Sequence, residues 1–173
     1  PMKPAAKKWT LLPLLLLAGW VIAAPAAAVT LGYPSTDHAS FLVDIPGDWE
    51  VSPGEELGDF VDVNSESGVY LAFRTIEGSE DAMQGAIEDT VAYLQENYKN
   101  VTVGDPKDVK QAGLEGFLMD GEGKDEDGTA IVFRAAWLAL ADGHIGEIWF
   151  AAPADDKAGI AAAAKALNSF RVP

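Results

Sequence analysis

The chain has 173 residues, no cysteine, 12 basic and 27 acidic side chains, and a formal net charge of −15 at pH 7. A field of this sign repels phosphate backbones and anionic lipid head groups, which argues against binding to nucleic acid. The lack of cysteine excludes disulfides and a lipid anchor on an N-terminal cysteine, so a single apolar core must supply the stability.

Residues 1–28 have the layout of a secretory signal peptide. A basic region with three lysines precedes an apolar stretch, Leu11 to Ala24, and three alanines at 26–28 suit a small-residue cleavage site. The stretch is short for a membrane span. We predict cleavage after Ala28 and export to a periplasmic or extracellular location, with an uncleaved N-terminal anchor as the alternative. Residues 29–173 are then predicted to form one domain.

The first part of this domain is predicted to be strands. Residues 29–40 are polar and turn-rich, and we interpret them as a lead-in segment. The run from Phe41 to Ile45 alternates, Pro46-Gly47-Asp48 makes a turn, and Trp49 opens a second strand. These features predict a hairpin in which the tryptophan ring covers one end of the core. Short strands are also predicted at 60–63 and 69–76.

A change of period then predicts a long helix. Ser79 is an N-cap residue, Glu80 and Asp81 charge the first turn, and apolar residues recur at three- and four-residue spacing from Met83 to Tyr98. A short strand at 101–103 follows.

Three strand candidates come next, at 108–121, 129–141 and 144–152. A charged loop at 122–128 separates the first two, and an Asp-Gly turn separates the last two. Both faces of the middle strand are largely apolar, which predicts cover on both sides of the sheet.

The chain closes on a helix that starts at Asp155-Asp156 and carries an apolar stripe from Ile160 to Phe170. Strands joined by short turns run antiparallel. The predicted fold class is therefore α+β, a central antiparallel sheet with two main helices packed on it in an α/β/α-type sandwich.

No residue pattern indicates a reaction. The only histidines, His38 and His144, are far apart in the sequence, and no Gly-x-Ser-x-Gly elbow is present. We therefore predict no catalytic residue, no cofactor and no resident metal site, and no enzymatic activity.

An acidic stretch around the predicted hairpin tip raises a calcium hypothesis, because calcium prefers several converging oxygen ligands. The spacing does not match an EF-hand loop, and Lys124 occupies a ligand position, so a solvated hairpin tip is the favoured interpretation. The candidate ligands for a weakly held calcium ion are Asp120, Glu122, Asp125, Glu126 and Asp127.

Aromatic and arginine side chains in the strands are the best candidates for a partner or ligand surface. If Trp149 shares a strand face with Glu147, its ring would be partly exposed and would form part of a partner site. Core packing of these tryptophans beneath a helix is the favoured interpretation. The two strand arginines, Arg74 and Arg134, would either anchor an anionic ligand or pair with an acid such as Glu147. The candidate surface residues are Trp49, Trp137, Trp149 and Arg134.

Short motifs in this order resemble the PsbP/DcrB-like superfamily, the exported relatives of the Mog nuclear-transport factors. The resemblance rests on Phe41, Pro46 and Trp49 for an aromatic strand with a P-x-x-W turn, on Gly113-Leu114-Glu115-Gly116 for a hairpin start, and on Asn168-Ser169-Phe170 near the end. It covers about Phe41 to Val172. It implies a central antiparallel sheet between helices, and members that are mostly not enzymes, such as extrinsic photosystem subunits, assembly factors and envelope proteins. The metal-binding histidines of some members have no matched pair here.

The sequence therefore predicts an exported, non-enzymatic binding or assembly protein of the cell envelope, whose partner is another envelope protein. The alternative is a carrier that holds a small apolar ligand between sheet and helix, where Trp137 and Phe133 would line the cavity. A hydrolase with an unrecognised site is a third interpretation.

Overall fold

The computed structural model describes residues 26–173. The predicted signal peptide lies outside the described residues except for its last three positions. Ala28, after which cleavage is predicted, is the first residue of strand β1, and Ala27 accepts a backbone hydrogen bond from Gly47 at 3.0 Å. Cleavage at this point would therefore shorten β1 by one residue.

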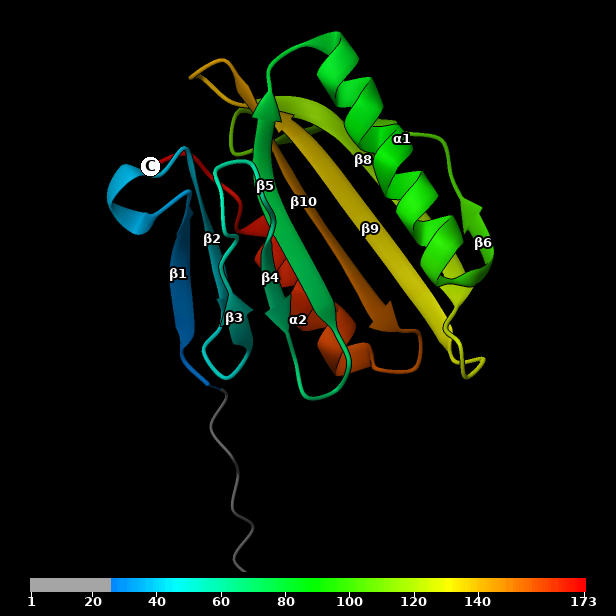
Figure 1. Ribbon diagram of the computed structural model, residues 1–173. Coiled ribbons are helices and arrows are strands. Elements are labelled where there is room, and N and C mark those ends of the chain that lie inside the picture. The colour runs from blue at the N-terminus through cyan, green and yellow to red at the C-terminus, as the bar shows by residue number, and fades with distance from the viewer. Residues whose placement is uncertain (1–25) are drawn as a thin grey trace, which may run out of the picture.

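Strands make up most of the regular structure, and two long helices interrupt them (Figure 1). In chain order the elements are β1 (Ala28–Tyr33), η1 (Thr36–His38), β2 (Phe41–Pro46), β3 (Glu50–Ser52), β4 (Val61–Asn64), β5 (Tyr70–Glu77), α1 (Glu80–Asn97), β6 (Lys99–Val103), β7 (Lys107–Gln111), β8 (Leu114–Lys124), β9 (Ala130–Ala139), β10 (His144–Pro153) and α2 (Lys157–Asn168).

An 8-stranded sheet forms the middle layer, with the order β3-β4-β5-β10-β9-β8-β6 and with β7 paired to β8 as well. Every strand pair in it is antiparallel. Figure 1 shows α1 on one face, and α2 with the β1–β2 hairpin on the other. The predicted α+β sandwich is confirmed.

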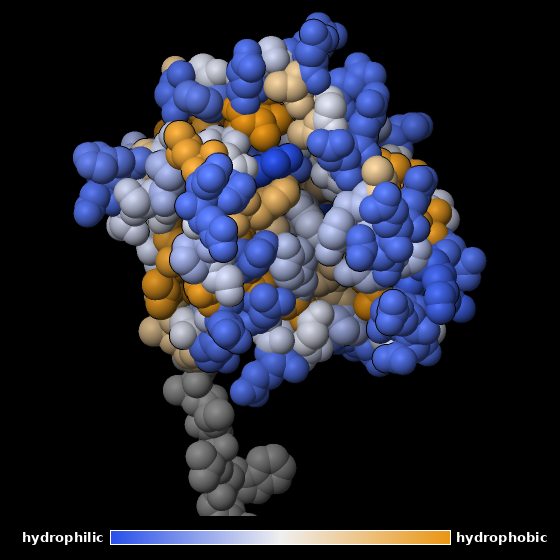
Figure 2. All heavy atoms as spheres, viewed as in Figure 1, coloured by the Kyte–Doolittle hydropathy of each residue, from blue (hydrophilic) through white to orange (hydrophobic). Residues whose placement is uncertain are grey.

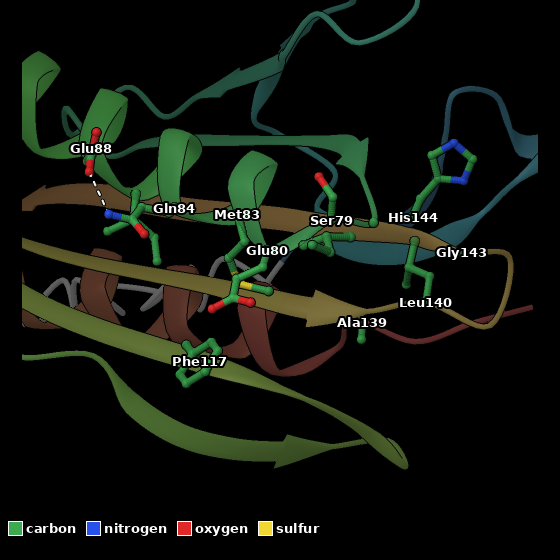
Figure 3. Close-up of a pocket in the computed structure, with 13 residues that line it drawn as sticks. Ser79, Glu80, Met83, Gln84, Glu88, Phe117, Ala139, Leu140, Gly143 and His144 are labelled. Carbon is green, nitrogen blue, oxygen red and sulfur yellow. Dashed lines mark hydrogen bonds between the residues drawn. The ribbon is translucent and has the colours of Figure 1, made fainter.

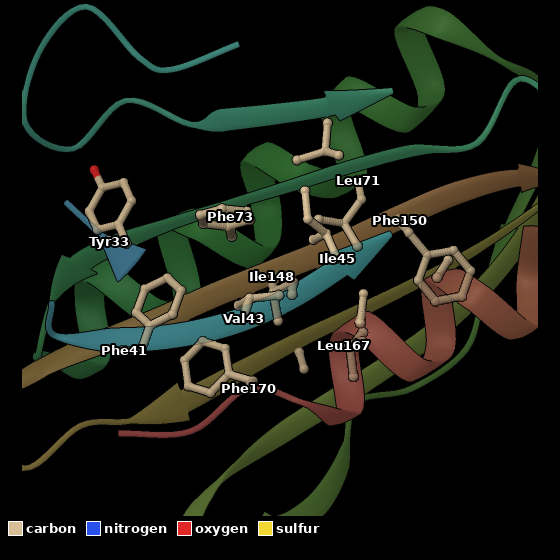
Figure 4. Close-up of a cluster of buried hydrophobic side chains, with 14 of the residues drawn as sticks. Tyr33, Phe41, Val43, Ile45, Leu71, Phe73, Ile148, Phe150, Leu167 and Phe170 are labelled. Carbon is tan, nitrogen blue, oxygen red and sulfur yellow. The ribbon is translucent and has the colours of Figure 1, made fainter. Parts of the chain in front are cut away.

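The two faces of the sheet bury different apolar clusters, because alternate residues of a strand point to opposite faces. On the α1 side, Trp137 and Trp149 pack beneath Leu94 of the helix. On the other side, Phe170 stacks on Phe41 with ring centroids 4.4 Å apart, and Phe41 meets the edge of Phe73 (Figure 4). The predicted cover on both faces is thus confirmed.

Side-chain caps begin both helices as the sequence indicates. The Ser79 hydroxyl accepts a hydrogen bond from the Ala82 amide at 3.1 Å, and the Asp156 carboxylate accepts one from the Gly159 amide at 2.8 Å. Each cap satisfies an amide that has no partner within its own helix.

The predicted hairpin between Phe41 and Val51 is wrong. Strand β2 pairs with β1 in a separate two-stranded sheet, whereas β3 pairs with β4 in the main sheet. The other edge of β2 is bridged at one position, where Leu42 exchanges two backbone hydrogen bonds with Arg171. The predicted lead-in segment therefore contains most of β1 and the short helix η1. The half-buried Trp49 does pack against the end of the core, as predicted.

The candidate strand at 108–121 is in fact two strands, β7 and β8. Ala112 and Gly113 connect them with positive φ angles of 50° and 81°, which is the backbone of a tight hairpin turn. Because β8 continues to Lys124, the charged hairpin tip comprises only residues 125–129.

Among residues 26–173, none of the helices has both the length and the apolar character that a membrane crossing requires.

Candidate functional site

A groove lies between the first half of α1 and the ends of strands β8, β9 and β10 on the same face of the sheet (Figure 3). Its volume is about 730 Å³. Met83 and Ile87 of α1 give the groove an apolar wall, and its apolar floor is contributed by Phe117, Ala139, Leu140 and Ile145. A volume of this order is within the range of ligand-binding clefts.

The groove continues along β7 into a second hollow of about 650 Å³. Met83, Phe117 and Ala139 line both, so the two form one depression that follows the hairpin β7–β8. We call this depression the α1–β8 groove.

The position of α1 explains why this part of the sheet is uncovered. Leu94 in its second half is 2% exposed and packs on the central strands, while Met83 and Ile87 in its first half stay half-buried. Phe117 is cross-strand partner to the fully buried Trp137, yet it is 36% exposed because no helix residue covers it completely. A large apolar side chain left open beside a groove favours binding.

His144, Ser79 and Glu80 all line the groove, which is the combination that a hydrolase would need. Their contacts do not match a catalytic triad. The Ser79 hydroxyl caps α1, and the His144 imidazole lies 3.2 Å from Asp142 and makes no hydrogen bond to Ser79. In Figure 3 the Ser79 hydroxyl and the His144 ring do not face each other.

A buried charged pair lies under the middle of α1. Glu147 is fully buried, accepts a hydrogen bond from Arg74 at 2.8 Å and one from Thr90 of the helix at 3.2 Å. Burial raises the pKa of Glu147, and Arg74 opposes this rise by its positive charge. The buried indole N–H of Trp137 also acts to lower the pKa of Glu147, although it makes no hydrogen bond to that carboxylate. The predicted pairing of a strand arginine with Glu147 is confirmed for Arg74.

A smaller hollow of about 250 Å³ lies beside this pair, among aromatic rings. Tyr70 and Tyr93 stand at an angle to Trp149, with ring centroids 5.0 and 5.5 Å away. The Arg74 guanidinium lies 4.3 Å from the centre of the Phe60 ring. The Arg74 guanidinium thus covers the face of the Phe60 ring that a cationic ligand would otherwise contact.

The tryptophans predicted for a surface are mostly core residues. Trp137 is 0% and Trp149 is 5% exposed, so core packing beneath a helix is confirmed and the hypothesis of an exposed Trp149 is wrong. Helix α1 covers the face that both rings share. Trp49 is half-buried, and Arg134 pairs with Asp120 at 2.6 Å. A partner contact through Trp49 or Arg134 stays a prediction.

The predicted ligand cavity lined by Trp137 and Phe133 is not present within the described residues. The hollow that Phe133 lines holds only about 10 Å³, less than one water molecule needs. The open space lies nearer the first turns of α1. Met83 and Ile87, which line this space, belong to the predicted apolar stripe of the helix, and Phe117 lies in a predicted strand. No local sequence pattern indicated that these three side chains remain partly exposed.

The acidic residues considered for calcium are spread along the hairpin. Asp120 pairs with Arg134, Glu122 lies within β8, and Asp125 accepts a hydrogen bond from the Thr129 amide at 2.8 Å. Asp127 is exposed at the tip. In the part of the chain that the structure describes, no three His, Asp or Glu side chains are grouped so that they could hold a metal ion.

Solved structures with a similar fold include three that superpose on this chain with a TM-score above 0.5. The cyanobacterial PsbP (CyanoP) of Synechocystis superposes with a TM-score of 0.59 at 12% identity, over 91% of this chain and 99% of that one. This chain has a PsbP-like fold. LpqN of Mycobacterium tuberculosis, described as involved in cell envelope biogenesis, gives 0.51 at 12% identity, over 88% of each chain.

A protein from Bacteroides thetaiotaomicron gives a TM-score of 0.51 at 14% identity, over 77% of this chain. The match spans only 45% of the Bacteroides protein. No protein-family model and no curated protein sequence matches this chain. The PsbP-like fold confirms the resemblance seen in the sequence motifs, and at 12–14% identity it establishes the fold alone.

Proposed function

We propose that this protein is an exported, non-enzymatic binding or assembly protein of the cell envelope, and that it holds another envelope protein in the α1–β8 groove. The observation that carries the proposal is the groove itself, an apolar depression in which Phe117 remains 36% exposed. The signal-peptide layout of residues 1–28 supports export.

The similar structures support the same assignment. One of them, LpqN, is described as involved in cell envelope biogenesis, and another is a PsbP protein. The groove lacks a nucleophile hydrogen-bonded to a base, so its geometry favours binding over acyl transfer.

Site-specific crosslinking tests this proposal. A photoreactive amino acid at position 117 should crosslink the mature protein to a partner in intact envelopes. The same group at Leu57, which is 80% exposed and lies outside the groove, is the matched control. We expect a crosslinked band from position 117 that the change Met83→Asp weakens. Equal bands from both positions, or none from position 117, would contradict the proposal.

A carrier of a small apolar ligand is a second candidate, because the groove lies between a helix and the sheet as that function requires. Native mass spectrometry of the purified protein should then show an added mass that disappears in Phe117→Asp. A bare chain mass in the unaltered protein would exclude a tightly held ligand.

A further inference from the structure

The rim of the α1–β8 groove is acidic on both sides. Helix α1 contributes Glu80 and Glu88, and the hairpin β7–β8 contributes Asp108 and Glu115. Asp108 is the cross-strand partner of Phe117, so the two residues are direct neighbours on adjacent strands. Two rows of carboxylates therefore flank one apolar strip.

The basic groups at the rim do not balance these acids. Lys110 lies 3.6 Å from Glu115, and both side chains are at least 70% exposed, which makes the pair weak in water. His144 is next to Asp142. Glu88 accepts a hydrogen bond from Gln84 at 2.9 Å, a neutral donor that leaves its charge uncompensated (Figure 3).

We propose that the groove binds a basic amphipathic segment of a partner protein, with an apolar side chain over Phe117 and lysine or arginine side chains against the two acidic rows. This inference rests on the proposed function and names the chemistry of its partner. Opposite charges at the rim of an interface favour correct partners and speed association, while like charges exclude wrong ones.

The alternative occupant of an apolar groove is an anionic amphiphile such as a fatty acid. Its head group could approach the first turn of α1, but Glu80 and Asp81 already occupy that turn and Ser79 caps it. The net charge of −15 repels anionic ligands further and attracts basic ones. Figure 2 shows hydrophilic side chains over most of one face, with smaller apolar areas between them, as expected for this composition.

Three probes and one competitor test the inference. The probes are a dye-labelled peptide of alternating leucine and lysine, its glutamate counterpart, and the neutral apolar dye Nile red, and the competitor is a fatty acid. At low salt we expect the lysine peptide to bind at least about tenfold more tightly than the glutamate peptide. Salt at about 0.5 M should remove most of this preference, because it screens exposed charges.

Charge reversal at the rim gives the decisive comparison. The double change Glu88→Lys with Glu115→Lys should abolish the preference for the lysine peptide and leave Nile red binding in place. The matched control, Glu66→Lys with Glu96→Lys, alters the net charge equally at exposed positions outside the groove. It should preserve the preference. Thermal melting verifies that both variants are folded.

The outcomes separate this inference from the proposed function. If Nile red binds and the peptides bind equally, or a fatty acid displaces the dye better than the lysine peptide does, the basic-segment inference is overturned and the groove remains a binding site. If no probe binds, the groove itself is not a binding site and the proposed function fails with it.

Discussion

Glu147 shows how one residue can set the pH dependence of the fold. Burial raises its pKa above the ordinary value of 4.5, and Arg74 and Thr90 oppose the rise. Between the unfolded and the folded pKa, the folded state keeps its proton while the unfolded state loses it. The free energy of unfolding must therefore fall as the pH rises through this window.

Replacing the Glu147 carboxyl group with an amide tests whether the free energy of unfolding falls with rising pH for this reason. In Glu147→Gln, we expect the fall in unfolding free energy from pH 4 to neutral pH to be smaller than in the unaltered protein, because the titrating group is gone. Urea unfolding at a series of pH values measures it. Glu96→Gln, on the exposed side of α1, is the control for the change in net charge. Parallel pH curves for all three proteins would contradict this assignment.

At the scale of an element, helix α1 serves both the core and the groove. Its second half is anchored by Leu94, whereas its first turns form the groove wall and depend on the Ser79 cap. The start of the helix is therefore expected to open before its end.

We predict that Ser79→Ala lowers the free energy of unfolding by about 1 kcal/mol, because one amide of the first turn loses its partner. Ser79→Asp keeps an acceptor at the cap and should cost much less. Hydrogen exchange should show faster opening of residues 80–84 in the alanine variant, with no change near Leu94. Uniform acceleration along the whole helix would show that the cap does not act locally.

At the scale of the whole molecule, the first and last segments of the described chain are joined. The Asp44 carboxylate of β2 accepts hydrogen bonds from Arg171 at 3.0 and 3.1 Å and from the Thr30 hydroxyl at 2.7 Å, and the Asp44 backbone amide donates one to the Ser169 hydroxyl at 2.7 Å. The hydrogen bond from Thr30, followed by that from Arg171, lowers the pKa of Asp44. This carboxylate therefore links the β1–β2 hairpin to the end of the chain.

The lowered pKa predicts acid sensitivity. The contribution of Asp44 to stability is present above its unfolded pKa and is lost as the pH falls through the folded pKa. We expect Asp44→Asn to be less stable than the unaltered protein at neutral pH, with the difference shrinking in acid. Asp48→Asn, at an exposed neighbouring turn, is the control. A difference that stays constant with pH would contradict the proposed role of the charge.

Local sequence patterns predicted the helices and most strand faces correctly. The split of β9 into an α1-facing and an α2-facing set follows from simple alternation, and Ser79 and Asp156 mark the helix starts. Errors arose where pairing is non-local. After Pro46-Gly47 the chain enters a different sheet, because β2 pairs with β1 and not with β3. Strand β2 also bonds to Arg171, which is more than 120 residues away in the sequence.

The candidate site was predicted only in part. The sequence identified Met83 and Ile87 as part of an apolar helix stripe. The cavity that it predicted at Trp137 and Phe133 is not there, and the groove lies at the first turns of α1 instead. Their size and aromatic character make Trp137 and Trp149 candidates both for a binding surface and for the core, and both lie beneath α1. Whether an apolar side chain is covered depends on where a helix crosses the sheet, and residue spacing does not encode that position.

By itself, the sequence determined the charge, the order of elements and the face on which each side chain lies, because these depend on composition and on periods of two or three to four residues. The tertiary structure alone decided which strands pair at a distance, and that Phe117 stays open while Trp137 is closed. The physical reason is that burial arises from contacts between segments far apart in the chain, in this case from a helix that leaves the ends of three strands uncovered.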